Sequence, residues 1–258
     1  MKKKRKNIGI NPSSLFVFVF LALLWQIVAM LEIVPSFMLP SPIAVCQAFI
    51  GDFRLLMMHL RITLVEAAIG LLFGLLLGFL AAYFMDRYEK IHRGLYPLLI
   101  VTQTVPTVAI APLLVLWMGY GMAPKVTLIV IVTFFPIAVN LYEGFQHADP
   151  DQIKLIEAMG GNKKDIFRYV KWPAAYPQFF SSLKIALSYS VVGAVIAEWL
   201  GGYGGLGVYM TKVKKSYSFD KMFAVIFLIS ILSLLLMGVV QLIQYKIMPW
   251  TAKGEETK

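Results

Sequence analysis

The 258-residue sequence contains few of the groups from which enzymes build their sites. Its single cysteine, Cys46, excludes a disulfide within the chain and any multi-cysteine metal site. The three histidines, His59, His92 and His147, lie far apart and form no H-x-x-H pattern. No G-x-x-x-x-G-K-[ST] sequence occurs, so the chain cannot form a P-loop for ATP. These absences predict a protein that is not an enzyme and carries no metal or cofactor of its own.

Charge is also scarce. Only 15% of the residues are charged, whereas soluble domains have about a quarter, and 59% are hydrophobic with a mean hydropathy of +0.74. The formal net charge of +10 is spread over short segments between apolar runs. Positive charge placed in this way reports membrane orientation, so we expect a lipid bilayer around the chain and no nucleic-acid partner. The composition predicts one all-α membrane domain.

The apolar runs are long enough for about six transmembrane helices. The predicted spans are residues 15–31, 63–84, 98–118, 126–145, 179–200 and 223–245. Pro106 and Pro112 interrupt the third span and Pro136 interrupts the fourth, which indicates broken helices facing a cavity. We therefore expect a basic N-terminus (1–14), a first span with an outer segment (15–61), a core domain (62–245) and a tail (246–258).

Lysine and arginine predict that both termini are cytoplasmic. With that orientation 17 basic residues lie inside and 7 outside, a clear positive-inside bias. The first apolar run follows MKKKRK, so a cleaved signal peptide is the alternative. The run is longer than a signal peptide's and has no A-x-A site, which favours a retained span.

An outer segment separates the first two predicted spans. Ser41 followed by Pro42 is typical of a helix start, and Ile43, Cys46 and Ile50 then recur at helical spacing. This pattern predicts an amphipathic helix, either lying on the outer surface of the membrane or packed against the bundle.

A polar, basic segment at residues 146–178 interrupts the apolar runs, QHADPDQIKLIEAMGGNKKDIFRYVKWPAAYPQ. Asp149 and Pro150 form a helix start, Gly160 and Gly161 end the helix, and a second helical stretch leads into the fifth span at Pro173. An element this small cannot bury its own apolar face, so it needs the bundle, a partner or both. A partner could receive the first helix in a surface groove, which is the helix-in-groove mode of recognition.

This segment resembles the "EAA" loop of bacterial ABC-importer permeases, E-A-A-x-x-x-G-(x)9-I-x-L-P. In that register Gly160 and Pro173 match, Val170 takes the isoleucine position and Trp172 the leucine position. Lys154 stands at the glutamate position, where the sequence departs from the pattern, and Glu157 lies out of register. The resemblance implies a loop that couples to an ATPase. Its residues are Asp149, Lys154, Glu157, Gly160, Gly161, Val170 and Pro173.

The resemblance extends over roughly residues 25–250. TQTVPTVAIAPL, FFPIAVN and GAVIAEWLG are similar to permeases for sulfonates, nitrate, taurine and thiamine-pyrimidine precursors, and closest in wording to those for hydroxymethylpyrimidine or formylaminopyrimidine. It implies a six-helix type I importer permease in the bacterial inner membrane. Its partners would be a cytoplasmic ABC ATPase that binds the ATP, an extracytoplasmic substrate-binding protein and a second, identical permease copy.

Polar side chains within the spans are candidates for the translocation path. Thr102, Gln103 and Thr104 lie beside Pro106 and either line the path or hydrogen-bond between helices. Two further candidates are Asn140, for which packing is the alternative, and Glu198. Glu198, which precedes the sequence GGYGGLG, is either functional or an interfacial glutamate held by a lysine or by backbone donors.

Other features have structural explanations. Glycines at positions 70, 74 and 78 predict close helix packing within the subunit or, alternatively, across a homodimer. Glu66 and Lys184 are expected near lipid headgroups at opposite faces. Lys212, Lys214 and Lys215 either face water or meet an acidic binding protein.

Three alternatives to a pyrimidine importer remain. The first is an importer of sulfonate, taurine or nitrate. It is disfavoured because the spans show no basic group at mid-membrane depth that would attract an anion. An ion-coupled secondary transporter would need several buried carboxylates, and only Glu143 and Glu198 approach that description. A structural assembly protein would have no cavity and no turnover.

Overall fold

The computed structural model describes residues 12–35 and 37–249, with side chains from residue 16 onward. Over these residues the chain is helical and contains no strand, which confirms the predicted all-α fold. The basic residues at 2–6 and at 253 and 258 lie outside the described residues, as does most of the predicted N-terminal segment.

Four helical segments are long and apolar enough to cross a membrane. They are α3 (Phe53–Arg87), α6 (Met122–Gln146), the continuous stretch Lys163–Leu200 that ends in α9 (Trp172–Leu200), and α11 (Phe219–Ile247). α3 begins ten residues before the predicted span, so the predicted boundary at residues 61 and 62 falls inside this helix.

A fifth span is broken. α4 (Glu89–Thr104) and α5 (Thr107–Met118) together pass the same test but are bent by 99° at the two residues between them. Val105 is extended there because a residue before proline is disfavoured in the helical region, and Pro106 begins the next helix. This confirms the predicted break. The expected interruptions at Pro112 and Pro136 are wrong, since both residues lie inside continuous helices.

The predicted first span corresponds to α1 (Pro12–Met30), whose part with described side chains, Phe16–Met30, is shorter than the length required of a span. Six spans is therefore an approximate count. α2 (Pro42–Gly51) begins as predicted, with the Ser41 hydroxyl accepting a hydrogen bond from the Ala44 amide at 3.2 Å. α2 contacts α11, α1 and α3, so it packs against the bundle.

The core forms where α6 packs against α3 and α9. Gly70, Gly74 and Gly78 of α3 face Ile129, Thr133 and Ile137 of α6. A methyl group added at Gly78 would stand 2.8 Å from Ile137, so the glycines permit a close approach that side chains would prevent. This confirms the prediction of close packing within the subunit.

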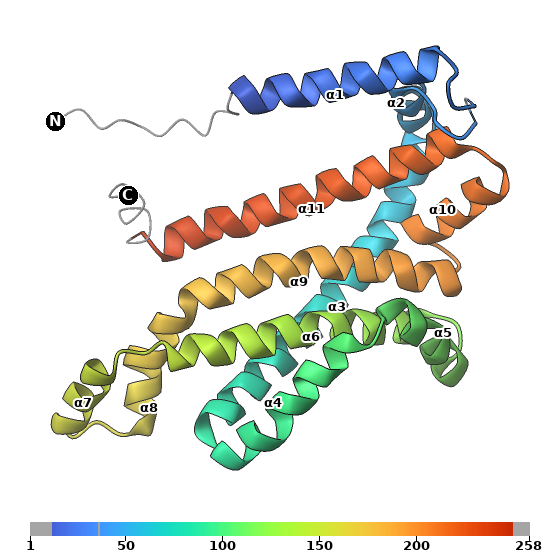
Figure 1. The fold of residues 1–258 in the computed structure, drawn as a ribbon. Helices are drawn as coiled ribbons and strands as arrows, with labels where there is room; N and C mark the ends of the chain where they lie inside the picture. Colours follow the sequence, from blue (N-terminus) through green and yellow to red (C-terminus); the bar gives the residue numbers. More distant parts are fainter. Residues whose placement is uncertain (1–11, 36, 250–258) are drawn as a thin grey trace.

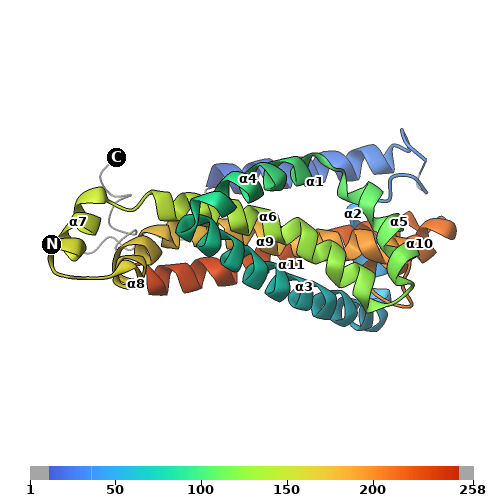
Figure 2. The ribbon, with the colours of Figure 1, turned by 90° about the horizontal axis from the view of Figure 1, so that it is seen from below.

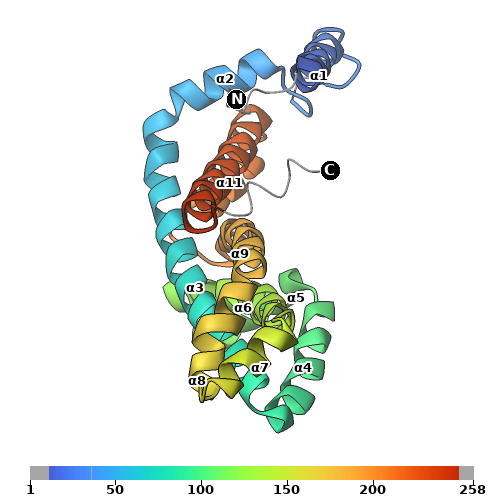
Figure 3. The same ribbon diagram turned by 90° about the vertical axis from the view of Figure 1, so that its left-hand side faces the viewer.

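The helices form an elongated bundle with two distinct ends. α9 and α11 lie side by side, and α3 runs along one side of the stack made by α11, α9 and α6 (Figures 1 and 3). α7 (Pro150–Ala158), α8 (Lys163–Ile166) and a π-helical turn (Phe167–Lys171) lie at one end (Figure 2). α10 (Leu206–Lys215), α5 and α2 lie at the other. We call these the α7 end and the α10 end.

Candidate functional site

The segment at the α7 end folds through local signals. The Asp149 carboxylate accepts a hydrogen bond from the Asp151 amide at 2.9 Å and begins α7. Asn162 and Asp165 form a reciprocal capping box that begins α8. Between the two helices Gly160 has a φ of +81°, a left-handed conformation that disfavours other residues. The predicted helix, glycine turn and second helix are confirmed.

This segment is joined firmly to the bundle through the π-helical turn. Lys171 donates a hydrogen bond to Asp86 at the end of α3 at 2.5 Å, and Gln146 at the end of α6 donates to the same carboxylate at 3.1 Å. Phe167 packs edge-on against Phe145 of α6 and Tyr83 of α3, with ring centroids 5.1 and 4.9 Å apart. A displacement of this turn would therefore reach α3, α6 and α9 together.

α7 itself projects from the bundle. None of its residues is buried, although Ile153 and Ile156 are half covered. Leu155 and Met159, one helical turn apart, expose 60% and 75% of their surfaces. Lys154 is exposed and pairs only loosely with Asp151, at 3.4 Å. An exposed apolar pair on a short helix is a surface suited to a partner.

A cavity of about 480 Å³ lies at the break between α4 and α5. Its walls come from the end of α4, the start of α5 and the middle of α6 and α9. Of the three polar residues beside Pro106, Thr102 and Gln103 line this cavity, whereas Thr104 does not. Asn140 also lies outside the lining, and its amide donates to the Pro136 carbonyl at 2.7 Å within α6.

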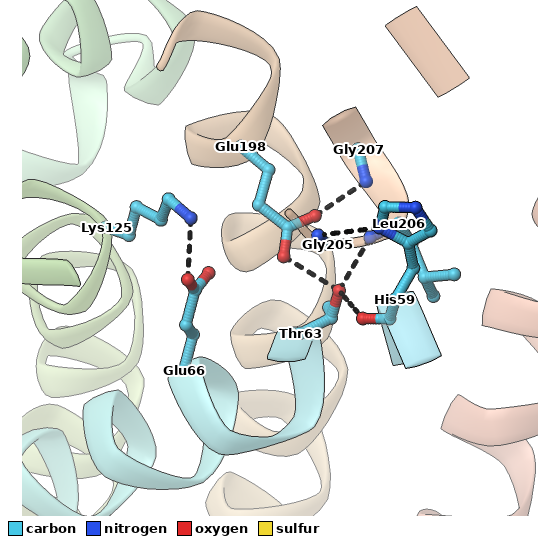
Figure 4. Close-up of polar contacts among 8 residues, drawn as sticks. All are labelled: His59, Thr63, Glu66, Lys125, Glu198, Gly205, Leu206 and Gly207. Atoms are coloured by element: carbon cyan, nitrogen blue, oxygen red, sulfur yellow. Dashed lines mark hydrogen bonds and ion pairs between the residues drawn. The ribbon is translucent and has the colours of Figure 1, made fainter. Parts of the chain in front are cut away.

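A buried polar cluster joins α3, α6, α9 and the start of α10 at the α10 end (Figure 4). The Glu198 carboxylate accepts hydrogen bonds from the Thr63 hydroxyl at 2.7 Å and the Gly207 amide at 2.6 Å. The Thr63 oxygen in turn accepts from the Leu206 amide at 2.9 Å. Glu198, which is 1% exposed, is thus anchored by one backbone amide and one threonine hydroxyl.

The second half of the cluster is an ion pair. Lys125 of α6 contacts Glu66 of α3 at 2.6 Å, and the two side chains are only 5% and 3% exposed. His59 completes the cluster, because its Nδ1 accepts a hydrogen bond from the Gly205 amide at 3.0 Å. These contacts fix the first turn of α10 against α3 and α9.

Asp52 forms a second attachment of α10, apart from the Glu198 cluster. Asp52, which precedes α3, accepts from the Tyr209 hydroxyl at 2.6 Å and pairs with Lys221 of α11 at 2.8 Å. Lys221 and Tyr209 together hold the pKa of the Asp52 carboxyl below its usual range. α10 is therefore held on both sides.

The comparisons with known proteins agree with this architecture. A family model described as the inner membrane component of binding-protein-dependent transport systems matches residues 74–249. This chain belongs to that permease family. A formylaminopyrimidine transport permease protein, ThiX, of Halalkalibacterium halodurans is 36% identical over 97% of this chain and 99% of its own length.

Another permease sequence and a solved transporter structure are also similar to this permease. A putative aliphatic sulfonates transport permease protein, SsuC, of Bacillus subtilis is 28% identical over 96% of this chain and 91% of its own length. A structure of the MetNI methionine ABC transporter, in an inward-facing conformation, matches 76% of the permease and 98% of its own chain with a TM-score of 0.68 at 19% identity. That structure shares the fold, as expected for a type I importer permease.

The sequence interpretation missed the ion pair of this permease. Lys125 falls between the predicted spans 98–118 and 126–145, and Glu66 was expected near the headgroups, but both are buried within the bundle. Pro124 could have indicated that Lys125 already lies in the first turn of α6, because proline is favoured there. Lys184 donates to Gln244 of α11 at 2.7 Å, so it has a protein partner in addition to any headgroup contact.

Proposed function

We propose that this permease is the membrane subunit of an ATP-driven importer that moves a thiamine-pyrimidine precursor, formylaminopyrimidine or hydroxymethylpyrimidine, into the bacterial cytoplasm. The α7 end would face the cytoplasm together with both chain termini, and the α10 end would face outward across the inner membrane. The positive-inside bias of the sequence supports this orientation.

α7 supports coupling to a cytoplasmic ATPase. It is exposed, it carries the apolar pair Leu155 and Met159, and the π-helical turn ties it to α3, α6 and α9. An ATPase groove that receives α7 would bury this pair. When two ATPase subunits bind ATP and close, they would displace α7. The helices attached to α7 would then move, so that the translocation path opens to the other side of the membrane. The permease itself would bind neither ATP nor another cofactor.

Two other partners complete the proposed complex. A second copy of this permease would form the other half of the path, and an extracytoplasmic binding protein would deliver substrate to the α10 end. Lys212 and Lys215 line a smaller hollow at that end and give it a basic rim, which suits an acidic partner surface.

The observation that carries the substrate assignment is the similarity to the formylaminopyrimidine permease along almost the whole of both chains. The similarity to the sulfonate permease is lower. Lys125, the buried lysine near the α10 end, is already paired with Glu66 and does not line the cavity. The described residues that line the cavity therefore offer an anion no cation.

Competitive uptake tests the substrate. Cells that express the permease, its ATPase and its binding protein are given labelled formylaminopyrimidine with a hundredfold excess of unlabelled hydroxymethylpyrimidine, taurine, an alkyl sulfonate or nitrate. Uptake is expected to fall with hydroxymethylpyrimidine and to stay unchanged with the three anions. Uptake of labelled sulfonate in place of the pyrimidine would retain the permease and reject the substrate.

A further inference from the structure

The cavity at the α4–α5 break lies inside the bundle, between its middle and the α10 end. Phe135 and Pro136 line it from the middle of α6, and Tyr189 and Gly193 line it from the second half of α9. Its volume of about 480 Å³ falls in the range of about 300–1,000 Å³ typical of small-molecule sites. A solute that crosses between the two ends of the bundle would pass this depth.

The described residues that line the cavity carry hydrogen-bonding groups but no charge. None of them is Asp, Glu, Lys, Arg or His. Gln103 projects from the last turn of α4, and its amide has no hydrogen-bond partner among the described residues. This amide can both donate and accept.

The wall at the break is rich in acceptors. The last four carbonyls of α4 have no amide partners in their own helix, because the chain leaves the helical conformation at Val105. The Thr104 hydroxyl donates to one of them, the Val101 carbonyl, at 2.8 Å. The Thr102 hydroxyl donates to the Leu99 carbonyl at 2.7 Å, so its remaining capacity at the cavity is to accept. A ligand that supplies N–H donors is favoured here, and an anion is disfavoured.

Two aromatic side chains also line the cavity. Tyr189 lines the cavity and exposes 52% of its surface, although it lies in the middle of a spanning helix. Phe135 is a second aromatic side chain in the lining. Stacking on aromatic rings is a general way to hold a planar heterocycle, because its π-face needs no charge to be recognised.

We propose that this cavity is a transit site that recognises a neutral, planar heterocycle bearing amino groups, with Gln103 forming hydrogen bonds to its edge and Tyr189 stacking on its face. The inference rests on the proposed function for the choice of an aminopyrimidine. It adds a selectivity step within the permease, separate from capture by the binding protein. Aliphatic sulfonates have neither the ring for Tyr189 nor a neutral head for an acceptor-rich wall.

The test measures initial uptake of labelled formylaminopyrimidine by the complete transporter carrying Gln103→Leu or Tyr189→Ala. Each variant is expected to lower uptake at subsaturating substrate about tenfold, the effect of losing one hydrogen bond or one stacking contact. Tyr189→Phe keeps the ring and is expected to recover most of the uptake that Tyr189→Ala loses. Thr104→Val, at the same break but outside the lining, is the matched control and is expected to stay within about twofold of wild type.

Membrane abundance and ATPase co-purification are measured for every variant, and binding-protein affinity for the labelled ligand is measured once because no variant alters that protein. If Gln103→Leu fails to assemble, Gln103→Asn replaces it, with an intermediate loss of uptake expected. If wild type takes up the pyrimidine and every variant takes it up equally well, the transit site is overturned and the proposed function stands. Absence of wild-type pyrimidine uptake would instead reject the proposed substrate.

Discussion

Lys125→Met is expected to destabilise the permease by about 3–5 kcal/mol, the usual effect of removing one partner from a buried ion pair. Lys125 contacts one oxygen of the Glu66 carboxylate, and the second oxygen has no hydrogen-bond partner among the described residues. Without the lysine, a buried carboxylate between α3 and α6 must either remain uncompensated or take up a proton. Thermal unfolding of the detergent-purified protein would show the loss as a lowered midpoint and reduced yield.

The double variant Glu66→Met, Lys125→Met separates charge from packing. Replacing both partners with apolar residues of similar volume is expected to restore most of the stability, because no buried charge is left. Lys184→Met is the matched control, since Lys184 bonds a neutral glutamine and is half-buried, and a loss of about 1 kcal/mol is expected. A single Lys125→Met variant as stable as Lys184→Met would contradict the assigned role of the ion pair.

Gly205→Ala is expected to abolish transport by displacing α10. Gly205 has a φ of +117°, which an alanine rarely adopts, and the added methyl group would collide with the Glu198 carboxylate. Because the Glu198, Thr63 and His59 contacts all meet at residues 205–207, one methyl group would disturb the whole attachment. The measurements are uptake by the complete transporter and the thermal midpoint of the purified permease.

The control for this variant is Gly94→Ala. Gly94 lies inside α4 with open space around it, so an alanine there is expected to leave uptake unchanged and to stabilise the helix by about 0.5–1 kcal/mol. Equal uptake by Gly205→Ala and Gly94→Ala would mean that α10 need not be held by this cluster.

Local signals made much of the fold predictable from sequence. The cap at Asp149, the glycine turn at Gly160 and the helix start at Ser41 each depend on a few neighbouring residues, and each is confirmed. The break at Pro106 was predictable for the same reason, since proline constrains the residue directly before it. Pro136 does not break α6, because neighbouring helices cover this buried residue and tolerate its missing hydrogen bond.

The buried cluster could not be predicted in this way. His59, Thr63 and Glu66 lie on one face of α3 at helical spacing, but their partners lie 59 to 146 residues further along the chain. Pro124 is a local sign that Lys125 belongs to α6, but no local signal shows that this lysine is buried against α3. Only the packing of α3, α6 and α9 shows this. The coupling and transit roles of the predicted residues stay predictions.

ATP-driven import by proteoliposomes containing the permease and its ATPase tests the central claim most directly. Formylaminopyrimidine and the binding protein are supplied on one side, ATP on the side of α7, and wild type is compared with Leu155→Asp and Leu155→Met. We expect ATP-dependent uptake in wild type and Leu155→Met, and at least a tenfold loss with loss of bound ATPase in Leu155→Asp, because a carboxylate would be buried in the ATPase groove. Uptake that proceeds without ATP, or that is unchanged in Leu155→Asp, would contradict the account.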